Sequence, residues 1–150
     1  MADAINIHAT VLVVGDRGIL IRGPSGSGKT TLALALAASA AAAGRFAALV
    51  GDDQLMAHPV AGRLVCRAPE SIAGLVEVRG RTPLPVAHVS ACVVDLAVSL
   101  VPPHEAPRYA EPEAATLAGC TVPVMRLSAL NVESTLPALA SWLLLPPFCR

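Results

Sequence analysis

The chain carries the segment Gly23-Pro24-Ser25-Gly26-Ser27-Gly28-Lys29-Thr30, which fits the pattern G-x-x-x-x-G-K-[ST]. Glycines let such a loop curl until successive backbone N–H groups point at phosphate oxygens, and a helix that begins at its end adds the positive end of its dipole. Lys29 would reach the β- and γ-phosphates, and the hydroxyl of Thr30 would ligate Mg²⁺. The segment therefore predicts an ATP site formed by all of its residues. The alternative is a glycine-rich turn with an incidental lysine.

The residues on both sides of this loop predict a strand before it and a helix after it. An apolar run over 5–14, rich in β-branched residues, is followed by a turn over 15–18 and a second strand over 19–22. Residues 29–43 are mostly leucine and alanine, which are strong helix formers, and Gly44 suits the position just after a helix. Because this helix is apolar all round, we expect it to be covered on most sides.

Short strands separated by turns dominate the remainder of the chain. We expect strands over 46–51, 54–58, 63–67 and 75–79, one or two within 86–101, and one over 121–127. A helical turn is expected at Pro69-Glu70-Ser71, and Asn131 is expected to cap a final helix. These elements predict a single α/β domain over 1–150 with a P-loop (Walker A) nucleotide-binding fold. Its β-rich sheet would carry one helix after the P-loop and another at the C-terminus.

Composition excludes several classes of protein. Hydrophobic residues make up 54% of the chain and charged residues 15%, which excludes intrinsic disorder. The 11 acidic residues balance the 11 basic ones, so no net charge favours nucleic acid or a membrane surface as a partner. The longest uncharged stretch expected to be helical, 30–44, is shorter than the roughly 20 residues that span a bilayer. The apolar surplus suggests that other subunits cover part of the surface, as in a homo-oligomer.

The four cysteines, Cys66, Cys92, Cys120 and Cys149, have no close spacing. They support neither a zinc site nor a disulfide framework. Scattered thiols and a first segment without a basic leader indicate a cytoplasmic protein. The only lysine among the 11 basic residues is Lys29, which singles out that residue.

Two carboxylates, Asp52 and Asp53, follow the strand expected over 46–51. A P-loop protein needs an acid at the end of a neighbouring strand to hold its metal, and we assign this role to Asp52. Asp53 then remains as the base for an acceptor hydroxyl. The alternative for the pair is an Asx turn. Farther along, strand alternation would place Glu77 and Arg79 on one face, either at the metal and the phosphoryl group or as an exposed ion pair.

Four segments occur in an order that resembles the catalytic domain of HPr kinase/phosphorylase, which acts on a serine of the phosphocarrier protein HPr. They are Asn6-Ile7-His8, the P-loop, Leu49-Val50-Gly51-Asp52-Asp53 and Ala68-Pro69-Glu70-Ser71-Ile72-Ala73-Gly74-Leu75-Val76-Glu77-Val78-Arg79-Gly80. The last segment is far more specific than the P-loop. The resemblance implies an ATP- and Mg²⁺-dependent protein serine kinase that phosphorylates an HPr-like carrier of a phosphotransferase system. It also implies a short form without the family's N-terminal domain, assembled as a hexamer.

The resemblance further implies roles for single residues. His8, which taken alone would more often be structural, matches an active-site histidine, and Lys29 matches the catalytic lysine. Asp53 matches the carboxylate that accepts the serine proton. Thr30 stands where the family has a magnesium-binding serine, and Glu77 matches the second magnesium ligand.

Two later segments of the chain match the family's pattern less closely. Arg108, in Pro107-Arg108-Tyr109, loosely matches an active-site arginine of the family. The family's dephosphorylation loop is replaced by Val124-Met125-Arg126-Leu127-Ser128-Ala129, which keeps one arginine and no glycine. We therefore expect the reverse, phosphorylase reaction to be weak or absent. Two other functions stay open from the residues alone, a P-loop kinase of a small metabolite and an ATP-binding sensor without catalysis.

Overall fold

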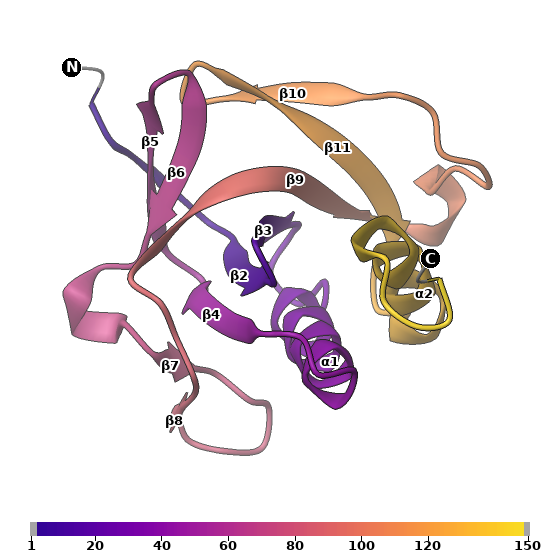
Figure 1. The fold of residues 1–150 in the computed structure, drawn as a ribbon, viewed down its shortest axis with the longest axis horizontal. Coiled ribbons are helices and arrows are strands. Elements are labelled where there is room, and N and C mark those ends of the chain that lie inside the picture. The colour runs from indigo at the N-terminus through magenta and orange to yellow at the C-terminus, as the bar shows by residue number, and fades with distance from the viewer. Residues whose placement is uncertain (1–2, 149–150) are drawn as a thin grey trace.

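Aliphatic and β-branched residues near the N-terminus build the hairpin that leads into the P-loop. In the computed structural model, which describes residues 3–148, β2 (Thr10–Val14) pairs antiparallel with β3 (Arg17–Arg22). Gly15 allows the turn between them with φ +61°. The chain then passes through the P-loop into α1 (Lys29–Ala42), which lies beside the sheet (Figure 1). The predicted order of strand, phosphate loop and helix is confirmed.

The apolar run over 5–14 does not form one continuous strand. β1 (Ile5–Ile7) pairs with β5 (Leu55–Val60), whereas β2 pairs with β3 and with β4 (Ala47–Gly51). The chain changes partners at His8, which lies between the two strands and is exposed. At this break the backbone of His8 belongs to neither strand.

Within residues 3–148, nine strands form one sheet in the order β1-β5-β6-β9-β3-β2-β4, with β11 attached to β9 and β10 attached to β11. The strands not yet introduced are β6 (Arg63–Arg67), β9 (Ala91–Val101), β10 (Ala114–Leu117) and β11 (Cys120–Ser128). Along one edge the long β9 pairs first with β6 and farther on with β11. The sheet therefore forks and curls (Figure 1).

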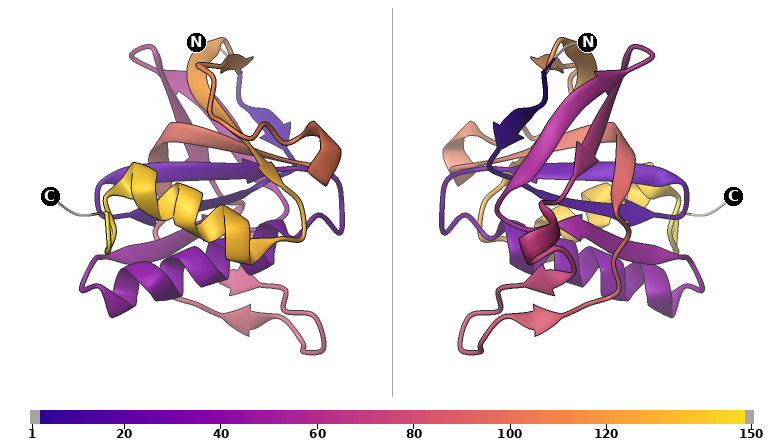
Figure 2. Two further views of the ribbon diagram at one scale, coloured as in Figure 1. Left: turned by 90° about the vertical axis from the view of Figure 1, so that its right-hand side faces the viewer. Right: turned by 90° about the vertical axis from the view of Figure 1, so that its left-hand side faces the viewer.

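β3, β9 and β11 run parallel, so their C-terminal ends meet at one end of the sheet. The P-loop, η2 (Pro103–Glu105) and the start of α2 (Val132–Leu143) gather there, as the left view of Figure 2 shows. β2 is antiparallel to both β3 and β4. The start of β2 and the end of β4 therefore also lie at this end, where ligands bind in open α/β sheets.

The sheet has apolar cores on both of its faces. Side chains alternate along β3, so Ile19 and Ile21 pack in the core beneath α1 and α2, and Leu20 packs in the core inside the curl. α1 is covered by the sheet and by α2, but Ala38 and Ala41 are exposed. Among the 14 residues of α1 only Thr31 and Ala42 are exposed as well, so the expectation that α1 is covered on most sides is confirmed. Its alanines leave little apolar area on the open side.

The later strands differ in part from the prediction, whereas the helical segments agree with it. β7 (Leu75–Val76) is shorter than the strand expected over 75–79, because it pairs with the equally short β8 (Leu84–Pro85) and the chain turns at 79–80. β10 was not predicted, since alanine is a poor strand former. The helical turn is confirmed as η1 (Glu70–Ile72). The final helix is confirmed as α2, and Oδ1 of Asn131 accepts the N–H of Ser134 at its start.

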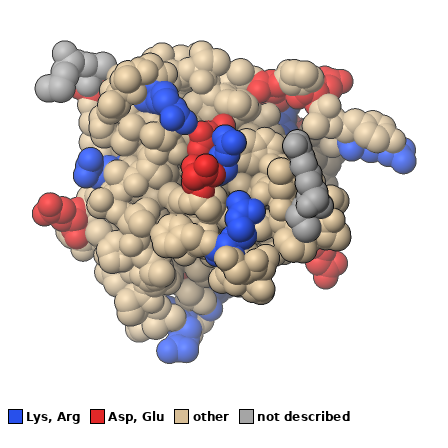
Figure 3. Space-filling view, viewed as in Figure 1, with Lys and Arg blue, Asp and Glu red and all other residues tan. Residues whose placement is uncertain are grey.

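Charged side chains are sparse on the surface. Figure 3 shows them scattered over a largely uncharged face, as the low charged content predicts. In the part of the chain that the structure describes, no helix combines the length and the hydropathy that a membrane crossing requires.

Candidate active site

Glycines shape the P-loop for two different reasons. Gly26 and Gly28 adopt φ of +81° and +90°, a region that residues with a Cβ rarely occupy. At Gly23 the limit is space, because an added Cβ would lie 2.6 Å from Oγ of Ser27. The loop can therefore curl tightly and end on the first N–H groups of α1, which have no partner within the helix. This arrangement suits a phosphate chain.

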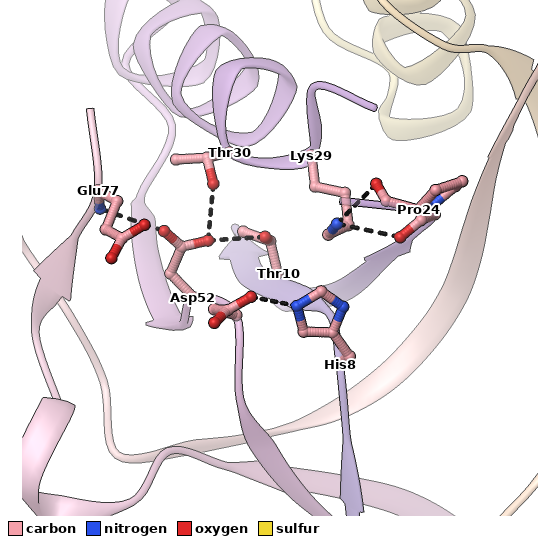
Figure 4. A network of polar contacts seen from close by, with 9 residues as sticks. His8, Thr10, Pro24, Lys29, Thr30, Asp52 and Glu77 are labelled. Carbon is pink, nitrogen blue, oxygen red and sulfur yellow. Dashed lines mark hydrogen bonds and ion pairs between the residues drawn. The ribbon is translucent and has the colours of Figure 1, made fainter. Parts of the chain in front are cut away.

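Lys29 is the first residue of α1 and is only 7% exposed. Its Nζ donates hydrogen bonds to the carbonyl oxygens of Gly23 and Pro24, at 3.0 and 3.2 Å (Figure 4). Phosphate oxygens are stronger acceptors than carbonyl oxygens because they carry charge. Lys29 can thus exchange these loop contacts for a phosphate without leaving the loop.

Asp52 follows β4 and is the centre of a polar network (Figure 4). Its Oδ1 accepts hydrogen bonds from the hydroxyls of Thr30 and Thr10, each at 2.8 Å. Its Oδ2 accepts the backbone N–H of Glu77 at 3.3 Å. The carboxylate predicted to serve the metal therefore already contacts the hydroxyl predicted to ligate it.

Thr10 is a member of this network that the sequence analysis missed. It is fully buried at the start of β2, and its Oγ1 contacts Asp52 from beneath the site. The available signal was a single hydroxyl within the apolar run over 5–14. Buried hydroxyls are nearly always hydrogen-bonded, so this residue needed a polar partner near the start of the strand.

His8 and Asp53 form an ion pair between Nε2 and Oδ1. They are 45 residues apart in the chain, but β2 and β4 are antiparallel neighbours, so the residues just before β2 lie next to those just after β4. Asp53 adopts φ +73°, which turns it away from the strand direction. Both side chains remain half exposed, at 51% and 59%, and so can be reached by another molecule.

One cavity of about 540 Å³ brings these groups together. Lys29 lies on its P-loop side, and the acid network and His8 line it as well. The segment after β7 adds Glu77, Arg79 and Arg81. Within residues 3–148, neither of these arginines has a carboxylate at ion-pair distance. The cavity therefore combines acids that suit a cation with bases that suit phosphates.

The oxygen donors of this cavity fit magnesium together with a nucleotide. No three His, Cys, Asp or Glu side chains of residues 3–148 converge into a metal-binding group. Magnesium usually takes one or two carboxylates and completes its shell with substrate phosphates and water. Thr30, Asp52 and Glu77 line the cavity, and they supply such a partial set of hard oxygen ligands.

The structure does not bring Arg108 into this cavity. Arg108 lies in the loop between η2 and β10, with its guanidinium 5.5 Å from the centre of the Tyr109 ring. Arg126, on β11, pairs with Glu113 at 3.1 Å and also does not line the cavity. The other residues predicted for catalysis and for the metal do line it, namely His8, Lys29, Thr30, Asp52, Asp53 and Glu77. Of the remaining P-loop residues predicted to bind the nucleotide, Ser25, Gly26 and Gly28 line this cavity, whereas Gly23, Pro24 and Ser27 do not.

Comparisons with known proteins point to one family. The family model described as the HPr serine kinase C-terminal domain matches residues 1–92. The chain is similar in structure to the HPr(Ser) kinase/phosphatase from Coxiella burnetii, with a TM-score of 0.76 and 27% sequence identity. That match covers 91% of this chain and 93% of the other. No curated protein matches the sequence.

Proposed function

The chain belongs to the HPr serine kinase C-terminal domain family, and on this basis we propose that it transfers the γ-phosphoryl group of ATP to a serine of an HPr-like phosphocarrier protein. The observation that carries the proposal is the ion pair between His8 and Asp53 at the edge of the cavity that holds Lys29. An exposed, oriented carboxylate beside a phosphate loop is what a kinase needs to accept a proton from an alcohol.

The P-loop and Lys29 would bind the phosphates of ATP and offset the negative charge that spreads over the transferred group. Thr30, Asp52 and Glu77 would hold Mg²⁺, which supplies further positive charge at the phosphates when it is bound. Thr10 contacts Asp52 from the buried side and would keep that carboxylate in one orientation. Arg79 and Arg81, which also line the cavity, are suited to the phosphate or to an acidic part of the acceptor.

Asp53 would take the proton of the acceptor serine. A bond forms between the serine oxygen and the γ-phosphorus, the bond from that phosphorus to the bridging oxygen breaks, and ADP leaves. His8 would hold the carboxylate of Asp53 toward the acceptor through their ion pair. Catalysis then comes mainly from positioning and charge neutralisation, as is usual in phosphoryl transfer.

The exposure of the proposed base supports a protein acceptor over a small metabolite. His8 and Asp53 are each about half accessible, so a serine on the surface of a folded protein can reach them. Small-molecule sites usually enclose most of their ligand. A metabolite kinase and an ATP-binding sensor nevertheless remain defined alternatives that the experiment below separates.

The contacts of Arg126 support the expectation that the reverse reaction is weak. It is the one arginine left in the segment that replaces the family's dephosphorylation loop, and it is engaged by Glu113 away from the cavity. In this position it contributes no charge where inorganic phosphate would bind. We propose that phosphorolysis of the phosphoserine is much slower than the forward transfer.

Assembly and location are part of the same proposal. Several large apolar side chains are exposed, including Phe46, Val60 and Phe148, and contact with further copies of the chain would cover them. We propose a cytoplasmic homo-oligomer, which sedimentation of the purified protein would test.

The proposal is tested with γ-labelled ATP, Mg²⁺ and a purified HPr-type carrier, followed by phosphoamino-acid analysis. The expected result is acid-stable label on serine that is lost with Lys29→Ala and retained with Arg17→Ala, a surface variant outside the cavity. Label on a small alcohol without any carrier would favour the metabolite kinase. ATP binding without label on any acceptor, unaffected by Asp53→Asn, would favour the sensor.

A further inference from the structure

A second cavity, of about 550 Å³, lies on the other side of the P-loop from the acid network. Three loops enclose it, 24–27 of the P-loop, 100–103 at the end of β9 and 128–131 at the end of β11. Of the last two loops, only Leu130 also lines the cavity that holds Lys29 and Asp53. They begin where two of the parallel strands end, beside the end of β3 (left view of Figure 2).

The strand order places the two cavities on opposite sides of β3. In the sheet, β9 and β11 lie to one side of β3, and β2 and β4 lie to the other. Asp52 and Asp53 follow β4, so the proposed metal ligand and the proposed base lie on the β4 side. A nucleotide whose phosphates follow the P-loop then extends from Asp53 toward the loops after β9 and β11. Ser25, Gly26 and Leu130 line both cavities, so the two are adjacent.

The walls of the second cavity are mainly apolar. No charged side chain lines it among the described residues, and its lining includes Leu100, Val101, Pro102, Pro103, Ala129 and Leu130. A phosphate or an acidic group would find no basic partner there, whereas a flat aromatic ring would find surfaces to pack on. Leu130 is 77% exposed and therefore free to cover such a ring.

Two backbone N–H groups of the loop at 128–131 are already occupied. The N–H of Ala129 donates to the carbonyl of Val101 at 2.8 Å, and the N–H of Leu130 donates to the carbonyl of Ser27 at 3.1 Å. The Oγ of Ser27, in contrast, is the only buried side-chain polar atom without a hydrogen-bond partner among residues 3–148. It lies where the P-loop meets the cavity and is available to a polar group of a bound molecule.

We propose that this cavity binds the base and sugar of the nucleotide, an inference that rests on the nucleotide binding proposed above. Leu130 and the segment 100–103 pack on the base, and Ser27 meets the polar sugar or the adjoining phosphate. The N–H groups of Ala129 and Leu130 already donate to carbonyl oxygens of the protein. The base is therefore held more by apolar contact than by hydrogen bonds to its edge. The site accordingly discriminates little between adenine and guanine.

Calorimetric binding of Mg²⁺-ATP and Mg²⁺-tripolyphosphate to the full chain separates the base from the phosphates. Leu130→Ala is expected to weaken ATP binding about fivefold to tenfold, because it removes apolar contact area, and to leave tripolyphosphate binding unchanged. Leu144→Ala is the matched control, since Leu144 is also an exposed leucine at positive φ but lies outside the cavity. It should change neither affinity.

Equal effects of Leu130→Ala on both ligands, or no effect on either, would overturn the proposal. A preference for ATP over GTP beyond about a hundredfold would overturn it as well, since apolar contact alone does not produce such discrimination. Amide chemical shifts give a direct map, because those that move with ATP but not with tripolyphosphate should cluster at 100–103 and 128–131. If ATP binds in this way and no acceptor is phosphorylated, the kinase proposal fails while this one stands. If neither ligand binds, both fail.

Discussion

The hydroxyl of Thr30 donates a hydrogen bond of 2.8 Å to Oδ1 of Asp52. Thr30 lies at the start of α1, and Asp52, 22 residues later, follows the end of β4. The contact links the last residue of the P-loop motif directly to the acid that follows the neighbouring strand. The same oxygen accepts a second hydroxyl from buried Thr10. Asp52 is thus oriented from two sides, and the residues that hold it need not touch a substrate to affect the reaction.

Thr10→Val should weaken magnesium binding without changing the fold. Valine has nearly the shape of threonine but cannot donate to Asp52, and loss of such a supporting contact typically costs about tenfold to a hundredfold in metal affinity or activity. We therefore expect the Mg²⁺ concentration for half-maximal phosphorylation to rise by about tenfold or more. Thr10→Ser keeps the hydroxyl and is the control. An unchanged Mg²⁺ dependence in Thr10→Val would show that Thr30 alone orients Asp52.

Replacing His8 should lower the rate of transfer through Asp53. General-base catalysis is worth about 10²–10⁴-fold, and His8→Ala removes the group that orients the base but not the base itself. We expect kcat to fall about tenfold to a hundredfold, with ATP binding intact. Asp53→Asn should lower kcat further than His8→Ala does, because it removes the base itself. The double variant should be no slower than Asp53→Asn alone, because the two residues act as a unit; additive losses would mean that His8 has a separate task.

Local patterns in the sequence predict much of this site, and the remainder depends on long-range pairing. The P-loop, α1 and the acids after β4 follow from spacing and propensity within single segments. The position of His8 depends on a change of strand partners between β1 and β2, which an apolar run does not reveal. Glu77 and Arg79 do reach the cavity, but through a turn after β7 and not through strand alternation. The prediction for Arg108 depended on a loose resemblance alone. The sequence does not show that its guanidinium lies beside Tyr109, outside the cavity.

Arg79 and Arg108 provide a comparison between a residue that lines the cavity and one that does not. The geometry predicts that Arg79→Ala lowers kcat/KM by tenfold or more, since a guanidinium is lost from the cavity where the phosphates are proposed to bind, roughly 1.4 kcal/mol or above. Arg108→Ala should have little effect within one chain, because its guanidinium lies over Tyr109. Steady-state kinetics on both variants would test this. A large loss in Arg108→Ala would instead mean that Arg108 reaches the cavity of a neighbouring chain in an oligomer.

The two facing thiols of the sheet should be unreactive in the folded protein. Cys66 on β6 and Cys92 on β9 are register partners. Burial raises the pKa of the Cys66 thiol to about 12. Burial, together with the nearby Cys66 and Asp95, raises the pKa of the Cys92 thiol to about 12. An ordinary thiol has a pKa of about 8.5. At pH 8 we expect iodoacetamide to label these two cysteines far more slowly in the native protein than in urea, as peptide mass spectrometry would measure.

The same pKa difference predicts how stability depends on pH. Between about pH 8.5 and pH 12 the unfolded chain loses thiol protons that the folded chain retains, so the folded state binds more protons and the free energy of unfolding falls as pH rises. The contribution is complete below about pH 8.5, where both states are protonated. Urea midpoints should therefore decrease from pH 8 to pH 10, and the decrease should be smaller in the double variant Cys66→Ala, Cys92→Ala. An equal decrease in both proteins would assign the alkaline destabilisation to other groups.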